Sequence, residues 1–184
     1  MSWLWIVLLA IVVVLVLLGI ATFNRLVRLR NRSENAWAQI DVQLKRRADL
    51  VPNLVESVKG YAAHERETFE AVTQARAQAE GARSVEERAQ AENALSAALG
   101  RLLAVAEAYP ELRASENFQQ LQQQLNETEN KVAVSRQVYN DTVLTYNTAL
   151  ETFPTNLVAG TLGFKPRTYF EAEDAARAAP QVRF

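Results

Sequence analysis

The sequence predicts an all-α protein in which an N-terminal transmembrane helix precedes an elongated antiparallel bundle of three long helices and a short C-terminal helix. Three observations lead to this class. Residues 3–23 form an apolar run without a charged side chain. Apolar residues then recur at steps of three and four, which is the spacing of one helical face. The composition favours helix, since it holds only 6 Gly and 5 Pro in 184 residues.

The apolar run over residues 3–23 is long enough to cross a bilayer, because about 20 residues rising about 1.5 Å each match a hydrocarbon core of about 30 Å. A cleaved signal peptide is the alternative. It fits poorly, because no basic side chain precedes the run and the run exceeds the apolar core of a signal peptide, about 7–15 residues. We therefore assign residues 1–24 to a membrane anchor.

The charges beside the anchor predict its orientation. No charged side chain precedes the run, and four arginines follow it: Arg25, Arg28, Arg30 and Arg32. The positive-inside rule places such a segment with its N-terminus outside and the rest of the chain in the cytoplasm. This predicts a single-pass membrane protein. The same arginines form a candidate membrane-surface site, because basic side chains beside anionic lipid gain about 1 kcal/mol each.

The body, residues 25–154, begins with a helix predicted over residues 24–81. An apolar seam runs from Trp37 to Ala79 at heptad spacing. Pro52 lies between two seam positions, where a proline removes one helical hydrogen bond. Because the seam keeps its phase, we predict one helix kinked at Pro52, and a helix that restarts there is the alternative. Gly60 is a second weak point.

Two further long helices complete the predicted bundle. Gly81 ends the first helix, and Ser84 with Glu87 forms a capping box that starts a helix over residues 85–108. The last helix runs from Ser115 to residue 153. Along its seam, large residues alternate with small or polar ones, which suits antiparallel packing.

The tail, residues 155–184, differs in composition. It reads as an ordered loop docked through Leu157, Val158, Leu162 and Phe164, followed by a short helix over residues 167–178. Clustered exposed aromatic side chains mark interaction sites. The candidate interaction patch is Leu162, Phe164, Tyr169, Phe170 and Phe184. The favoured interpretation, however, is that the tail simply covers an end of the bundle, and the interaction patch is the alternative.

The composition argues against most chemistry. There is no Cys and one His, His64, so a zinc site lacks its further ligands. A net charge of −1 gives no basic surplus for nucleic acid. We therefore expect no cofactor, no metal and no enzymatic activity. A carboxylate-only metal site or enzyme is a distant alternative, and its candidate residues are Glu107, Glu111, Glu127 and Glu129.

Three long segments carry a family resemblance. They are residues 28–79, RLRNRSENAWAQIDVQLKRRADLVPNLVESVKGYAAHERETFEAVTQARAQA, residues 99–154, LGRLLAVAEAYPELRASENFQQLQQQLNETENKVAVSRQVYNDTVLTYNTALETFP, and residues 156–176, NLVAGTLGFKPRTYFEAEDAA. In order, they resemble the LemA family of bacterial membrane proteins. The resemblance implies an N-terminal anchor, a helical bundle and no established biochemical activity. A magnetosome-membrane relative hints at membrane organisation, by analogy alone.

Together these observations favour a non-enzymatic scaffold or adaptor. Its expected partners are the lipid bilayer and a protein that the sequence does not identify. The alternative is a self-assembling, homo-oligomeric membrane organiser, because anchors held in one plane gain avidity from weak contacts.

Overall fold

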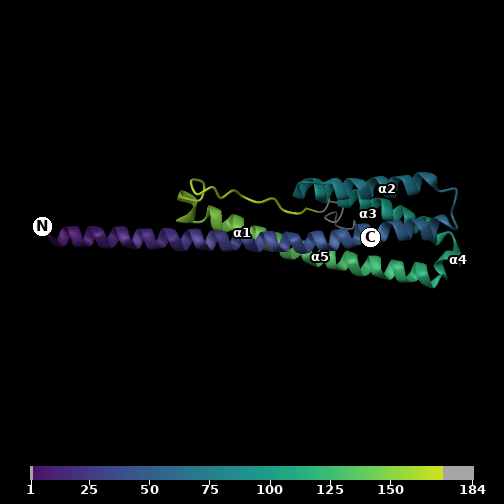
Figure 1. Ribbon diagram of the computed structural model, residues 1–184, viewed down its shortest axis with the longest axis horizontal. Coiled ribbons are helices and arrows are strands. Elements are labelled where there is room, and N and C mark those ends of the chain that lie inside the picture. The colour runs from purple at the N-terminus through teal and green to yellow at the C-terminus, as the bar shows by residue number, and fades with distance from the viewer. Residues whose placement is uncertain (1, 172–184) are drawn as a thin grey trace, which may run out of the picture. The chain divides into compact units, whose positions relative to one another are not determined.

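The computed structural model describes residues 2–171, and these residues form helices joined by short connections without any strand (Figure 1). The helices are α1 (Ser2–Lys59), α2 (Arg66–Gly81), α3 (Val85–Glu107), the single turn α4 (Pro110–Arg113) and α5 (Glu116–Glu151), followed by the 3₁₀ turn η1 (Thr155–Leu157). The predicted all-α class with a long N-terminal apolar helix is confirmed.

The described residues divide into two compact units. The anchor unit contains residues 2–37 and 139–167, and the bundle unit contains residues 38–138 and 168–171. The expected boundaries at residues 24 and 154 differ from this division. The reason is that α1 and α5 are each divided between the two units. Residues that are distant in the sequence therefore pack together in one unit.

Helix α1 runs through Pro52 without interruption, as the continuous seam predicts. The Pro52 ring is exposed, while Val51 and Leu54 on the core side are buried. A proline on the solvent side is tolerated because water can satisfy the backbone carbonyl that loses its donor.

The prediction of one helix over residues 24–81 is wrong at its second weak point. Helix α1 ends at Lys59, and residues 60–65 form turns before α2 begins. The amide of Ala62 donates to the carbonyl of Val58 at 2.9 Å, which closes the end of α1. Ala62 is buried. The apolar phase continues because α1 and α2 cover the same core, so periodicity alone did not reveal the turn.

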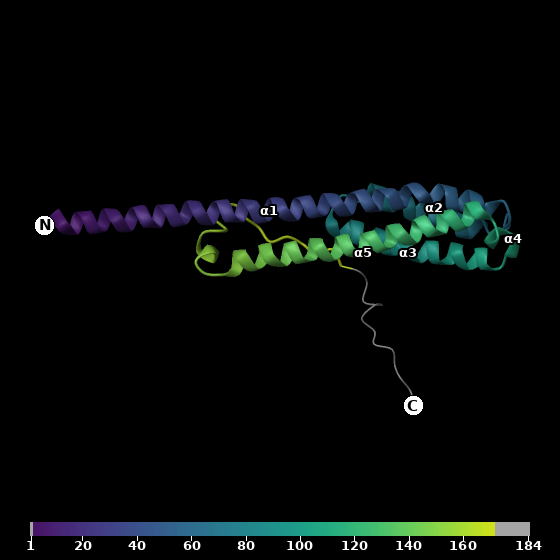
Figure 2. The ribbon, with the colours of Figure 1, turned by 90° about the horizontal axis from the view of Figure 1, so that it is seen from below.

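The bundle unit packs part of α1, all of α2 and α3 and the first part of α5 around one core. Helix α2 lies against α3 with the opposite direction (Figure 1), and α5 runs along the same bundle (Figure 2). The largest buried side chains of this core come from all four helices: Leu50, Leu54, Phe69, Leu95, Leu99, Leu102, Phe118, Leu121 and Leu125. The bundle unit is thus a four-helix arrangement, because α2 is a helix of its own.

The predicted start of α3 is confirmed. The Ser84 hydroxyl accepts the amide of Glu87 at 3.1 Å, and the Glu87 carboxylate accepts the amide of Ser84 at 3.3 Å. Pro110 begins α4, because its fixed φ suits the first position of a helix.

The anchor unit is closed by the chain that follows α5. Its core contains Leu26 from α1, Tyr146, Ala149 and Leu150 from α5, and Ala159 and Phe164 from the connection beyond. Burial raises the pKa of the Tyr146 hydroxyl. The Asn147 side chain donates to the Arg167 carbonyl at 2.8 Å and accepts the Arg167 amide at 2.9 Å. The Arg167 guanidinium also pairs with Glu34 on α1.

The tail is docked, but through fewer side chains than the sequence predicts. Phe164 is buried, whereas Leu157, Val158 and Leu162 are exposed. Residues 167–171, predicted to begin a short helix, are not helical. The rest of that predicted helix lies outside the described residues.

Candidate functional site

The apolar run occupies the first part of α1, and its residues 3–21 are all exposed. Its most apolar 18-residue window has a mean hydropathy of 3.3 and no buried residue. Among the described residues this is the one helix long and apolar enough to cross a membrane. An exposed, all-round apolar helix of this length is stable only in a lipid environment or a protein interface. These properties point to a membrane location.

The four predicted membrane-surface arginines are all exposed. Arg25, Arg28 and Arg32 follow steps of three and four, so they form one basic stripe along α1. Arg30 lies off this stripe. Its guanidinium carbon is 5.7 Å from the centre of the Phe164 ring, and its Nε is 4.0 Å from Glu34. Arg30 therefore contributes to packing of the anchor unit, and the other three remain directed at solvent.

Most described residues of the predicted tail patch are not exposed. Phe164 and Phe170 are buried, Tyr169 is half-buried, and Leu162 alone is exposed at 44%. Phe184 lies outside the described residues. The position of an aromatic residue in the tail does not predict whether its side chain is exposed, since Phe164 and Phe170 are both buried.

A buried group of charges, which sequence reasoning largely missed, lies in the bundle unit. Its three buried members are Arg47 on α1 and Arg88 and Glu92 on α3, each at most 8% exposed. Arg47 lies 3.4 Å from the Glu92 carboxylate and 3.2 Å from that of Glu129 on α5. It also donates to the Ser96 hydroxyl at 2.6 Å.

Arg88 extends the same group to the remaining helix. Its Nε lies 3.2 Å from the Glu92 carboxylate, and its Nη2 lies 3.5 Å from Asp41 on α1. Its Nη1 donates to the Ala79 carbonyl at 2.7 Å, near the end of α2. The charge network, meaning Asp41, Arg47, Arg88, Glu92 and Glu129, therefore contacts all four helices of the bundle unit.

Part of the charge network could be read from the sequence. An arginine on an apolar seam, such as Arg47, packs its stem and directs its charge to water or to a carboxylate. The carboxylates here are those of Glu92 and Glu129. Arg88 and Glu92 have the four-residue spacing of a helical ion pair. Nothing in the sequence showed that these residues meet Arg47, because that contact depends on how α1 and α3 pack.

The charges of the network are paired with one another across the helices. Burial raises the pKa of the Glu92 carboxyl, although the neighbouring Arg47 and Arg88 act to lower it. The buried Nε of Arg47 has no hydrogen-bond partner among the described residues. Buried ion pairs with unsatisfied atoms add little stability, but they strongly disfavour wrong packing. The network can therefore specify how the helices align.

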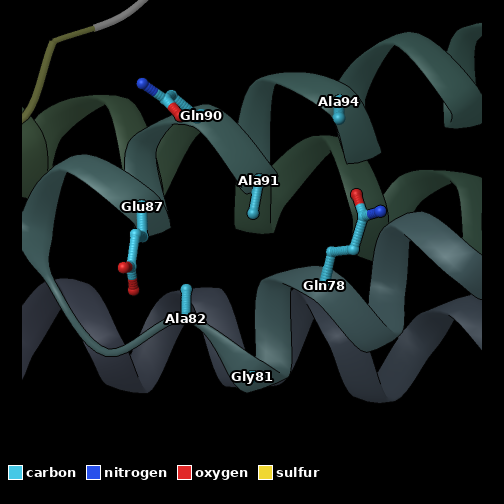
Figure 3. A pocket seen from close by; sticks show the side chains of 7 residues that line it. All are labelled: Gln78, Gly81, Ala82, Glu87, Gln90, Ala91 and Ala94. Atoms are coloured by element: carbon cyan, nitrogen blue, oxygen red, sulfur yellow. The ribbon is translucent and has the colours of Figure 1, made fainter.

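An open pocket between α2 and α3 offers no reactive group. It is lined by Gln78, Gly81, Ala82, Glu87, Gln90, Ala91 and Ala94 (Figure 3). The Glu87 carboxylate accepts the amides of Arg83 and Ser84, which is its capping role. These hydrogen bonds lower the pKa of Glu87. The remaining side chains are small or carry neutral amides.

The other candidate residues for chemistry are dispersed. His64, expected on a helix, is exposed in the connection between α1 and α2. Glu129 pairs with Arg47, and Glu127 accepts a hydrogen bond from Gln123 at 3.0 Å. No group of three or more His, Asp or Glu side chains that could hold a metal occurs within residues 2–171.

Comparison with known proteins identifies the family of this chain. The model of the LemA family matches residues 36–184. The chain belongs to the LemA family. Protein LemA of Metamycoplasma hominis is 28% identical over 156 residues, which is 84% of this chain and 71% of that protein. The family match includes every residue of the charge network, whereas the apolar run and the arginine stripe precede it.

Magnetosome proteins share a shorter segment with this LemA-family chain. Magnetosome protein MamQ 2 of Paramagnetospirillum magneticum is 37% identical over 78 residues, and MamQ of Magnetospirillum gryphiswaldense is 33% identical over 78 residues. Each match covers 42% of this chain and 29% of the relative. The chain thus spans less than a third of the length of these magnetosome proteins.

The charge network of this LemA-family chain predicts how its stability changes with pH. A raised pKa means that the folded state binds the Glu92 proton more tightly than the unfolded state. The stability that the bound proton of Glu92 adds to the folded state is therefore fully present below the ordinary pKa of 4.5. It is lost as the pH rises through the raised pKa that Glu92 has in the folded state.

We expect the free energy of unfolding of the native chain, relative to Glu92→Gln, to increase as the pH falls from 8 towards about 4.5. Urea unfolding of the full chain in detergent micelles, followed by circular dichroism, measures this difference. Glu56→Gln is the control, because Glu56 is exposed on α1 and pairs only with Lys59. A difference for Glu92→Gln that stays constant over this range would contradict the prediction.

Proposed function

We propose that this LemA-family chain is a non-enzymatic scaffold or adaptor anchored in the bacterial inner membrane. The observation that carries the proposal is the composition of α1. One uninterrupted helix supplies both the exposed apolar run and a wall of the bundle core, including Leu44, Leu54 and Val58. Helix α1 therefore contributes residues to both the apolar run and the bundle unit.

The proposed orientation places the bundle unit in the cytoplasm. It is supported by the exposed Arg25, Arg28 and Arg32 at the end of the apolar run and by the lack of charged side chains before it. Because the chain has no cysteine, one introduced thiol reports its location. A cysteine at Ser57 should resist a membrane-impermeant maleimide in intact cells and react after lysis. Reaction in intact cells would reverse the orientation.

An adaptor role is supported by an exposed apolar pair on the bundle unit. Val134 and Val138 of α5 are 63% and 44% exposed and lie one helical turn apart, on one face. Single exposed valines are ordinary on protein surfaces, but adjacent ones favour a contact with another protein. A second copy of the chain could also supply that contact, and this supports self-assembly as the second candidate function.

The mass of the protein extracted with its native lipid in polymer nanodiscs tests both candidates. A protomer with an additional, unrelated mass supports the adaptor. A discrete multiple of the protomer supports self-assembly, and a bare protomer contradicts both. In either supporting case, we expect Val134→Ser with Val138→Ser to reduce the added mass. Gln120→Ser with Gln124→Ser is the matched control, since both glutamines are exposed on the same helix at the same spacing.

A further inference from the structure

The loop that follows α5 exposes an unusual set of apolar side chains. They are Phe153, Leu157, Val158 and Leu162, with exposures of 78%, 68%, 40% and 44%. Isolated exposed apolar residues need no explanation, but several together mark a contact with a partner or a membrane. Between Thr152 and Pro166 the sequence has no acidic side chain.

The loop is attached to α1 where the apolar run ends. The Phe164 ring packs edge-on against Phe23, the last residue of the run, with 5.6 Å between ring centres. Phe164 and Ala159 also share a buried cluster with Leu26. Figure 1 shows the loop, in yellow-green, beside this part of α1. All of these residues belong to the anchor unit.

The position of Phe23 defines the depth of the loop in the bilayer. The run over residues 3–23 fills the hydrocarbon core at about 1.5 Å per residue, so Phe23 lies at the boundary where aromatic rings settle. A loop packed against Phe23 lies at the same boundary. Exposed basic side chains flank it there, namely Arg25 and Arg28 on α1 and Lys165 beyond the loop.

The backbone of the loop is suited to this environment. The amides of Val158 and Ala159 donate to the Thr155 carbonyl at 3.0 and 2.9 Å, and the amide of Leu162 donates to the Val158 carbonyl at 3.0 Å. The Phe164 amide donates to the Ala159 carbonyl at 3.0 Å. Hydrogen bonds made within the loop lower the cost of placing its backbone among lipid headgroups.

We propose that residues 153–162 form a second membrane contact, in which Phe153, Leu157, Val158 and Leu162 insert shallowly into the leaflet through which α1 leaves the bilayer. The occupant of this surface is lipid, because the surface adjoins the transmembrane run, has no acidic side chain of its own and is flanked by the basic Arg25, Arg28 and Lys165. The inference rests on the proposed membrane anchoring. It makes the anchor unit a two-point attachment, since one helix crosses the bilayer and one loop lies in its surface.

The test uses the full chain in nanodiscs, with one introduced cysteine that carries an environment-sensitive dye. Leu157→Cys is the probe, and Leu144→Cys is the matched control because Leu144 is a leucine of the anchor unit with 55% exposure. We expect blue-shifted emission at position 157 and a loss of that emission when the lipids carry a spin label near the headgroup. Position 144 should emit as in water and lose little.

Two outcomes would count against the loop contact, and a third probe separates them from a failure of anchoring. Val13→Cys, within the apolar run, should be quenched by lipids spin-labelled deep in the acyl chain. If position 13 is quenched while position 157 emits as in water, the loop contact is wrong and the anchor stands. A blue shift at position 157 without lipid quenching would assign the surface to a protein and also overturn the inference. Without quenching at position 13, the anchoring itself fails.

Discussion

Replacing both Val13 and Leu17 by arginine will release the protein from the membrane. Both side chains are exposed on the apolar run, at 49% and 60%, and lie one helical turn apart. Each arginine near the centre of a membrane helix costs about 2.5–3.5 kcal/mol on insertion scales. Two on one side therefore remove about 5–7 kcal/mol, which is a large part of what the apolar run gains from burial in lipid.

The measurement is the fraction of protein that stays in the membrane pellet after alkaline extraction of cells. Ala38→Arg with Val42→Arg is the control, because it places the same charges at the same spacing on exposed positions of α1 beyond the apolar run. The control should stay in the pellet with the native chain. If the Val13 and Leu17 variant stayed there as well, the apolar run would not be the anchor.

Replacing Arg47 by methionine will strongly destabilise the bundle unit. The change leaves Glu92 buried with Arg88 as its one remaining ion-pair partner, at 3.2 Å. It also removes the ion pair between Arg47 and Glu129 on α5. Removing one member of a buried ion pair costs about 3–5 kcal/mol, mostly because the remaining charge stays in a site with few partners.

Urea unfolding of the full chain in detergent micelles measures this loss as a lower midpoint. Arg46→Met is the control, because Arg46 is the exposed neighbour of Arg47 on the same helix. We also expect Arg47→Met combined with Glu92→Met to be more stable than Arg47→Met alone, since no acid is then buried without its partner. If Arg47→Met and Arg46→Met unfolded at the same midpoint, the charge network would not hold the bundle together.

Several features followed from the sequence because they depend on neighbours along the chain. The apolar run defined the exposed part of α1 by length and polarity, and Ser84 with Glu87 defined the start of α3. The seam predicted the continuity of α1 through Pro52. The turn at residues 60–65 was not predicted, because α1 and α2 cover the same core and show the same apolar spacing on both sides of the turn.

The candidate sites divide in the same way. Arg25, Arg28 and Arg32 were found from their places after the apolar run, and the structure leaves them exposed. The exposed loop was not predicted as such, since Leu157, Val158 and Leu162 were expected to dock together with Phe164, and Phe164 alone of the four is buried. Whether an apolar side chain in a loop is buried depends on the helix that happens to cover it.

By itself, the sequence determined the helical class, the apolar run, the basic stripe beside it and the capping of α3, because these need only local hydrogen bonds and the period of one helix. Only the tertiary structure decided that Arg47 meets Glu92 across 45 residues of chain, and that Phe164 packs on Phe23 and leaves its loop exposed. The physical reason is that such contacts are set by the direction and alignment of packed helices. Many alignments bury equally apolar seams, and the pairing of a few charged and aromatic side chains favours one of them.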